Sequence, residues 1–166
     1  MPTLKCVLAL GLILASASPI AAQSGHSVSF VGAPWTSGSS SQGFYHAFIC
    51  IATKLTSGIK EDCYGFYPAQ AAKAAIGGPG KINGLDIRRI DAGSVATGYI
   101  DITVDQRRKI FAQIDEWSKK EYDLTDQNCI DFVDAIAAML GVKRPSRIPT
   151  QKPVDYIQKL KSLNGI

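Results

Sequence analysis

Residues 44–68 read FYHAFICIATKLTSGIKEDCYGFYP, and this stretch decides how the chain is expected to fold. Aromatic and aliphatic residues fill both of its ends, and a polar Lys-Leu-Thr-Ser-Gly segment separates them. We therefore predict a mostly buried strand over Phe44–Thr53, a second strand over Asp62–Tyr67, and a hairpin that joins them. A turn centred on Thr56 and Ser57 then fixes the register of the two strands.

That register makes a specific prediction about four side chains. It places Cys50 opposite Cys63 and His46 opposite Tyr67. Residues that face each other on antiparallel strands have roughly the close Cβ spacing that a disulfide requires. We therefore expect a bridge between Cys50 and Cys63.

Three helices are expected after the hairpin. Thr103 and Gln106 form a capping box for a helix over 104–120. A second helix should begin near Asn128, run to Leu140 and stop at Gly141. A third should begin at Pro153 with Thr150 as its cap. Its inward residues are expected to be Val154, Ile157, Leu160 and Leu163.

The remaining segments carry weaker signals. We expect an extended Gly/Ser-rich lead-in over 25–42 with one edge strand near 28–31, and a short alanine-rich helix after Ala69. A surface loop is predicted at 77–80, where three glycines and a proline cluster. Further strands are expected at Leu85–Ile90 and Val95–Val104. Strands followed by helices predict an α+β fold, with an antiparallel sheet packed against the helices.

The first residues have the pattern of a signal peptide. Lys5 is the only early charge, an apolar run covers 6–14, and small residues lead to a cleavage site expected after Ala22 or Ala17. The domain prediction is thus a signal peptide over 1–22 and one domain over 23–166. The apolar run is shorter than the about 20 residues that span a bilayer. The mature protein is expected to be secreted or periplasmic, with no integral membrane segment.

Composition argues against several functions. The net charge of +4 falls to +3 when Lys5 leaves, and the basic residues are dispersed, so a nucleic-acid partner is not expected. Scarce histidine gives no zinc-ligand spacing, and we expect no metal and no cofactor. The acidic side chains single out no pair for glycosidase chemistry. Asp131 and Asp134 are expected to face solvent.

Counting thiols points to one cysteine. Cys6 leaves with the signal peptide, so three cysteines reach an oxidising compartment, and pairing Cys50 with Cys63 leaves Cys129 free. Cys129 follows a plausible N-cap, where unpaired backbone N–H groups and the helix dipole should lower the pKa of its thiol. The alternative interpretation is that Cys129 is a small apolar residue in the core.

Histidine counting points to a partner for this thiol. Only two histidines are present, and His26 lies in the lead-in, which is expected to be mobile. His46 stands at the start of an apolar strand, where the sheet would fix its backbone. We therefore predict Cys129 as a nucleophile and His46 as its general base, although a lone histidine in a strand is more often structural.

The order of these motifs resembles a known group of proteins. A histidine on a strand, a second strand, and then Asn-Cys-x-x-Phe at a helix start are similar to circularly permuted papain-like proteins. This group includes the NlpC-type peptidases and their relatives, among them lecithin:retinol acyltransferase-like and deSUMOylating-isopeptidase-like enzymes. The matching pieces are 45–48, 64–67, and 122–125 followed by 128–133; the section 69–104 matches nothing in the group.

The resemblance implies a cysteine amidase or peptidase that works through an acyl-enzyme. Tyr67 is a candidate for the third group that orients His46, and a dyad without a third member is also acceptable. Export makes peptidoglycan stem peptides the expected substrate, for a protein expected to be a monomer. The alternatives are a lipid or thioester acyl hydrolase or transferase on the same dyad, and a non-catalytic exported binding or inhibitor protein.

Overall fold

The computed structural model describes residues 25–35, 44–70, 76–85 and 93–166. The predicted signal peptide, the alanines of 71–75 and nearly all of the strand predicted at Leu85–Ile90 lie outside these ranges.

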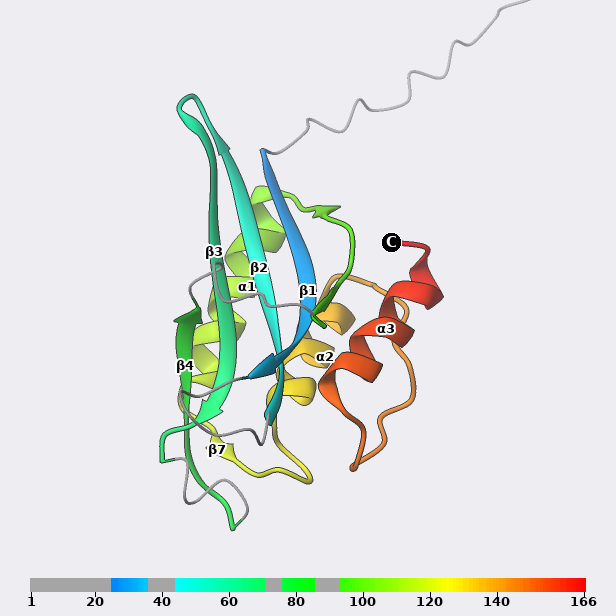
Figure 1. Cartoon of the computed structure of the whole chain (residues 1–166). Coiled ribbons are helices and arrows are strands. Elements are labelled where there is room, and N and C mark those ends of the chain that lie inside the picture. The colour runs from blue at the N-terminus through cyan, green and yellow to red at the C-terminus, as the bar shows by residue number, and fades with distance from the viewer. Residues whose placement is uncertain (1–24, 36–43, 71–75, 86–92) are drawn as a thin grey trace, which may run out of the picture.

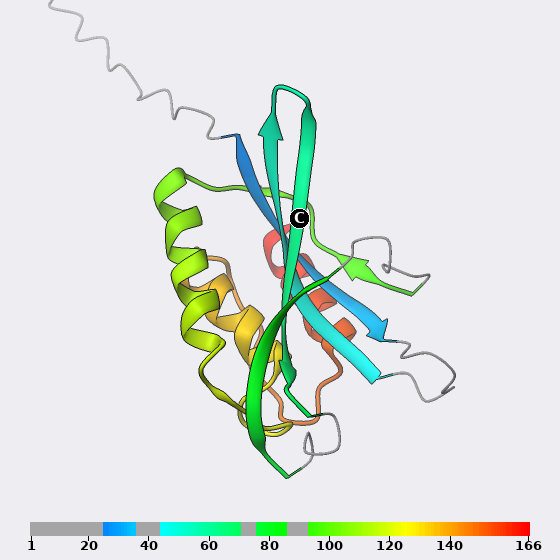
Figure 2. The ribbon, with the colours of Figure 1, turned by 90° about the vertical axis from the view of Figure 1, so that its left-hand side faces the viewer.

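The described residues form an antiparallel sheet with helices on one of its faces (Figures 1 and 2). The strand order is β5-β1-β2-β3-β4-β7, and β6 also pairs with β1. The strands are β1 (His26–Trp35), β2 (Phe44–Leu55), β3 (Gly58–Pro68), β4 (Gly78–Leu85), β5 (Val95–Ala96), β6 (Ile100–Asp101) and β7 (Glu121–Tyr122). The helices are α1 (Val104–Trp117), α2 (Cys129–Met139) and α3 (Pro153–Asn164). The predicted α+β class with an antiparallel sheet is confirmed.

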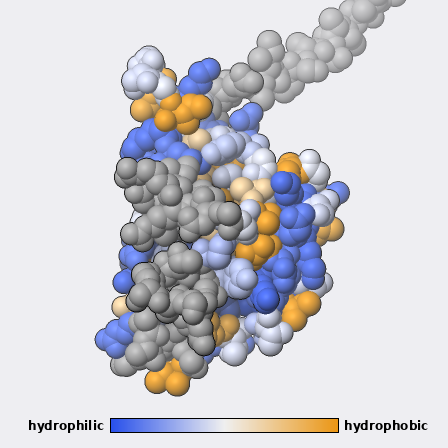
Figure 3. Space-filling view, viewed as in Figure 1, coloured by the Kyte–Doolittle hydropathy of each residue, from blue (hydrophilic) through white to orange (hydrophobic). Residues whose placement is uncertain are grey.

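The hairpin has the predicted register. Leu55 pairs with Gly58 across a two-residue turn, and Cys50 pairs with Cys63. The predicted disulfide is present between these cysteines, whose Cα atoms lie 4.0 Å apart. Both strands reach further toward the turn than expected. Apolar surface gathers at this tip (Figure 3), where the exposed fractions of Leu55 and Ile59 are 47% and 77%.

Strand alternation divides the buried side chains of the sheet into two clusters. On β2, Ala47, Ile49 and Ile51 join the large core cluster that the helices complete. Phe48 and Cys50 project to the other face and belong to a small separate cluster with Cys63. Each residue of β2 therefore has an assigned side of the sheet, which matters for the site described below.

Two expectations for the first strand were wrong. β1 is a ten-residue strand between β2 and the pair β5 and β6, so it is not an edge strand. His26 is the first residue of β1, and its Nδ1 lies 3.2 Å from the hydroxyl of Thr53. Ladder pairing with β2 holds a segment whose Gly/Ser content alone suggested a loose lead-in.

The predicted surface loop at 77–80 was also wrong, because β4 begins at Gly78 and pairs with β3. A Cβ atom on Gly80 would lie 2.2 Å from the Phe66 ring and 2.8 Å from the carbonyl oxygen of Lys120. Glycine at position 80 therefore allows β4 to pass close to β3 and the end of α1. The single strand predicted over Val95–Val104 is instead split into β5 and β6.

The helix predictions succeeded in outline. The Thr103–Gln106 capping box is present on α1, and α2 begins directly after its N-cap Asn128. α3 begins at Pro153, but its N-cap is Lys152 and no side chain caps it, so the predicted Thr150 cap was wrong. On α3, Ile157 and Leu160 are buried as expected, whereas Leu163 is 47% exposed. No helix among the described residues is long and apolar enough to cross a membrane.

Candidate functional site

Cys129 occupies the first position of α2, and a local hydrogen-bond network fixes this helix start. Asn128 Oδ1 accepts the N–H of Ile130 at 2.8 Å, and Asp131 Oδ2 accepts the N–H of Asn128 at 2.9 Å. Asn128 Nδ2 also donates to the carbonyl oxygen of Leu124 at 2.7 Å. The N-cap thus joins α2 to the loop before it and holds Cys129 in place.

The sulfur of Cys129 has polar neighbours. The backbone N–H groups of Ala47 and of Cys129 itself lie near the sulfur and favour its thiolate form. The hydroxyl of Tyr122, on β7, is hydrogen-bonded to Cys129 as well, and burial followed by the nearby Cys129 charge raises the pKa of that hydroxyl. Among the described residues Cys129 is the free cysteine, and it is buried.

Burial nevertheless raises the pKa of the Cys129 thiol to about 11. Desolvation is the largest cause, and the carboxylate of Asp131 adds to it, whereas the two N–H groups and Arg147 act in the opposite direction. The lowered pKa expected from the helix start was therefore wrong. The N–H groups are present, but Cys129 is only 4% exposed. Loss of hydration therefore destabilises the thiolate more than these donors stabilise it.

Cys129 lines a cleft of about 280 Å³. One wall comes from the segment that leads into α3, and the others come from β2, β7 and the start of α2. The lining consists of Tyr45, Tyr122, Leu124, Asn128, Cys129, Ile130, Pro149, Thr150, Gln151, Lys152 and Pro153. The lining contains both apolar and polar side chains, so the cleft is not a purely apolar groove.

His46 is buried near the start of β2, opposite Ala33 of β1. Its ring stacks on Tyr67 with 3.9 Å between ring centroids, and it lies over Gly65, where a Cβ atom would be 2.4 Å from Nε2. Burial lowers the pKa of His46 to about 3. Its Nε2 is enclosed and has no hydrogen-bond partner among the described residues.

The structure brings Cys129 to the backbone beside His46 but does not pair the two side chains. The sulfur contacts the N–H of Ala47, on the face of the sheet that carries α2. His46 projects to the other face, together with Phe48, whose ring is stacked on it at 6.2 Å. His46 and Ala47 are neighbours in β2, but their side chains project to opposite faces of the sheet. The predicted nucleophile and the predicted base therefore lie on opposite faces.

Tyr67 does lie against His46, as the hairpin register predicted, but the two rings meet face to face at 24°. The nitrogen atoms of imidazole form hydrogen bonds in the ring plane. Stacking alone therefore gives Tyr67 no way to orient the imidazole through a hydrogen bond.

The other polar groups have structural partners. Asp131 is paired with Arg147 at 2.9 Å, and Asp134 accepts hydrogen bonds from Arg144 at 2.5 Å and from Tyr156. The expectation that these two carboxylates face solvent was wrong, because each serves to hold the segments after α2.

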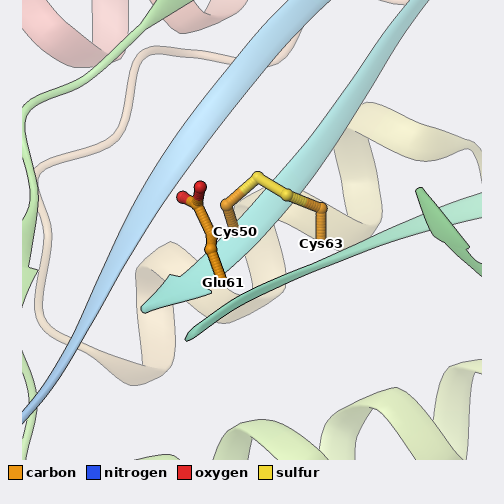
Figure 4. Close-up of side chains that lie close together, drawn as sticks. All are labelled: Cys50, Glu61 and Cys63. Carbon is orange, nitrogen blue, oxygen red and sulfur yellow. A yellow bond between two sulfur atoms is a disulfide. The ribbon is translucent and has the colours of Figure 1, made fainter. Parts of the chain in front are cut away.

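A second cluster lies on the opposite face of the sheet from α2. The carboxylate of Glu61 lies beside the sulfurs of Cys50 and Cys63, with the three ligand atoms within 4.8 Å of one another (Figure 4). The sulfurs are bonded to each other and offer no thiolate to a cation. Glu61 instead accepts a hydrogen bond from the Tyr99 hydroxyl.

The sequence did not single out Tyr122, Arg147 or Gln151 as site residues. Tyr122 reaches the sulfur because residues 123–127 form a tight loop, closed by paired backbone bonds between Asp123 and Gln127. Its closeness to Cys129 in sequence was the available signal. Nothing local indicated that the chain after α2 returns to the start of that helix.

The comparisons with known proteins give one structural likeness. No family model matches the chain, and no curated protein matches it. The fold is similar to the crystal structure of a type VI secretion system effector, TseH, with a TM-score of 0.55 and 15% sequence identity. The likeness covers 83% of this chain and 89% of that one.

Proposed function

We propose that this chain is an exported cysteine hydrolase of the papain-like, NlpC-related type, with Cys129 as nucleophile and His46 as general base. One observation carries the proposal: a free cysteine at a helix start lines a cleft, with two backbone N–H groups and a tyrosine hydroxyl beside its sulfur. A cysteine that only fills space in a core needs neither a cleft nor polar donors.

The reaction would be acyl transfer to the thiol. Cys129 Sγ bonds to the substrate carbonyl carbon as its proton passes to His46, and the C–N bond breaks as the amine takes that proton. Water then hydrolyses the thioester, releases the carboxylic acid and restores the thiol. When the sulfur bonds to the carbonyl carbon, the N–H groups of Ala47 and Cys129 would donate hydrogen bonds to the oxyanion that forms.

The proposal requires His46 to reach the sulfur, and at His46 the strand β2 is paired on one side. The ladder between β2 and β3 ends at the pair of Phe48 and Gly65, although β3 continues to Pro68 on its other side. The first residues of β2 are thus laddered to β1 alone. A turn of this strand end would carry the imidazole from the Tyr67 ring toward Cys129.

Three observations support the proposed compartment, and the proposed substrate rests on that compartment. The signal-peptide pattern and the Cys50–Cys63 disulfide favour export to an oxidising compartment. The similar fold of TseH, a secretion effector, is compatible with a protein that acts outside the cytoplasm that makes it. An amidase in that location meets peptidoglycan stem peptides, which we propose as its substrate.

Digestion of purified peptidoglycan tests the function directly. We expect fragments with newly freed carboxyl and amino ends, detected by mass spectrometry, and we expect Cys129→Ala to abolish them. His46→Ala should lower the rate by at least about a hundredfold, the usual contribution of a general base. Products that persist with Cys129→Ala would refute the assignment of the nucleophile.

A second candidate is a non-catalytic exported binding protein, which the enclosure and raised pKa of Cys129 favour. It predicts tight binding of envelope fragments with no covalent product. A lipid or thioester acyl substrate is the remaining alternative, and Cys129-dependent release of fatty acid from acyl substrates, without release of peptidoglycan fragments, would support it.

A further inference from the structure

We propose that the carboxamide of Gln151 is a binding subsite for one residue of an extended peptide, which makes the cleft select amides over esters. The inference rests on the proposed function for the place of the reacting bond. It adds the chemical class of substrate that the wall of the cleft recognises.

The amide of Gln151 has unused hydrogen-bonding capacity. Its Nε2 and Oε1 atoms are both shielded from solvent, and neither has a hydrogen-bond partner among the described residues. Buried amides are almost always paired, because an unpaired donor or acceptor loses its water without compensation. Gln151 lines the Cys129 cleft, and because its amide has no hydrogen bond to break among the described residues, a turn of the side chain would present both atoms to a bound substrate.

A carboxamide and one residue of an extended peptide are complementary. The N–H and C=O of such a residue point to the same side, as they do in an antiparallel ladder. Gln151 can donate from Nε2 to that carbonyl oxygen and accept that N–H at Oε1. An ester linkage has no N–H, so it would leave Oε1 unpaired as the free protein does.

The wall that carries Gln151 is tied to the helix that carries the thiol. Arg147 contacts Asp131 through two nitrogens, at 2.9 Å and 3.3 Å, and Asp131 also caps α2 beside Cys129. The N–H of Gln151 donates to the carbonyl oxygen of Ile148 at 3.0 Å, which closes a turn after Arg147. A peptide held by Gln151 would therefore keep a fixed distance from the sulfur.

Binding measured without turnover tests the subsite. In a Cys129→Ala background, calorimetry would compare a peptidoglycan stem peptide with depsipeptide analogues in which single backbone N–H groups are replaced by oxygen. We expect at least one analogue to bind about tenfold more weakly than the peptide, as loss of one hydrogen bond predicts. Gln151→Met should weaken peptide binding about tenfold or more and abolish the preference over that analogue.

The free protein supplies a second measurement and a control. Gln151→Met replaces an unpaired buried amide by an apolar chain of similar length, so the melting temperature should rise by a few degrees while peptide binding falls. Gln158→Met, at an exposed position on α3, should change neither quantity. Gln151→Glu keeps an acceptor and loses the donor, and it should also bind the peptide more weakly.

Two results would overturn the subsite: equal weakening of peptide and depsipeptide by Gln151→Met, or no weakening of either. The outcome is separate from that of the hydrolase proposal. If Cys129→Ala leaves peptidoglycan cleavage intact while the Gln151-dependent preference holds, the subsite stands and the nucleophile does not.

Discussion

At the scale of single residues, Cys129 joins a helix start, which favours a thiolate, to an enclosure that disfavours it. The enclosure is the larger effect, because the pKa of the thiol is raised to about 11. Once deprotonated, such a thiolate is a strong nucleophile, since nucleophilicity rises with pKa. The site therefore depends on a base or on substrate binding to remove the proton.

Alkylation by iodoacetamide should show how burial affects the reactivity of Cys129. We expect native Cys129 to react more slowly at pH 7.5 than the same cysteine in urea, because little thiolate is present and access is poor. The rate should then rise about tenfold per pH unit until the pH approaches 11. Mass spectrometry of the modified peptide measures it, and a native rate above the unfolded rate would contradict the burial argument.

His46 makes a prediction about acid stability. Its folded pKa, about 3, lies below the ordinary value of 6.5, so the unfolded chain binds the extra proton first as the pH falls. The stability that neutral His46 contributes is complete above about pH 6.5 and is lost progressively toward pH 3. Urea titrations of wild type and His46→Gln should therefore converge as the pH is lowered through this window. Parallel curves would show that His46 is charged within the fold.

The sequence could select Cys129 and His46 because each is scarce, but it could not place them on one face. Their relation depends on a single step of strand alternation between His46 and Ala47, and on the emptiness of Gly65, over which the ring lies. Both are properties of the assembled sheet. Gln151 was beyond prediction for the same reason, since an unpaired amide is recognised only when its surroundings are known.

At the scale of elements, the start of α2 depends on two hydrogen bonds made by the side chain of Asn128. Asn128 caps the helix and also holds the carbonyl of Leu124. We expect Asn128→Ala to lower the free energy of unfolding by about 1–2 kcal/mol, more than Thr103→Ala does at the exposed cap of α1. Urea denaturation measures both. Equal losses would show that the contact with Leu124 contributes nothing.

Local signals explain which elements were foreseen. The two-residue turn fixed the hairpin register, and side-chain caps marked α1 and α2. β4 was missed because glycine and proline dominate its start, and its strand conformation depends on pairing with β3. The Thr150 cap failed because α3 begins with Pro153, whose lack of an N–H leaves one fewer donor to satisfy.

At the scale of the whole molecule, the disulfide links β2 and β3 within the central hairpin. Loop-closure entropy over a sequence separation of 13 residues predicts a contribution of about 2–4 kcal/mol to the free energy of unfolding. The double variant Cys50→Ala and Cys63→Ala should lose this amount in urea titrations. A reducing agent should destabilise the wild type and leave that double variant unchanged, which separates the bridge from other effects of the reagent.

The position of that bridge in the chain affects the order in which the cysteines can pair during export. In a polypeptide threaded through a membrane N-terminus first, Cys50 and Cys63 emerge together, and the hairpin between them brings them into register by local contacts alone. Cys129 emerges later, on a helix whose core the sheet completes. A bridge that forms before Cys129 emerges would shield the free thiol from a wrong partner.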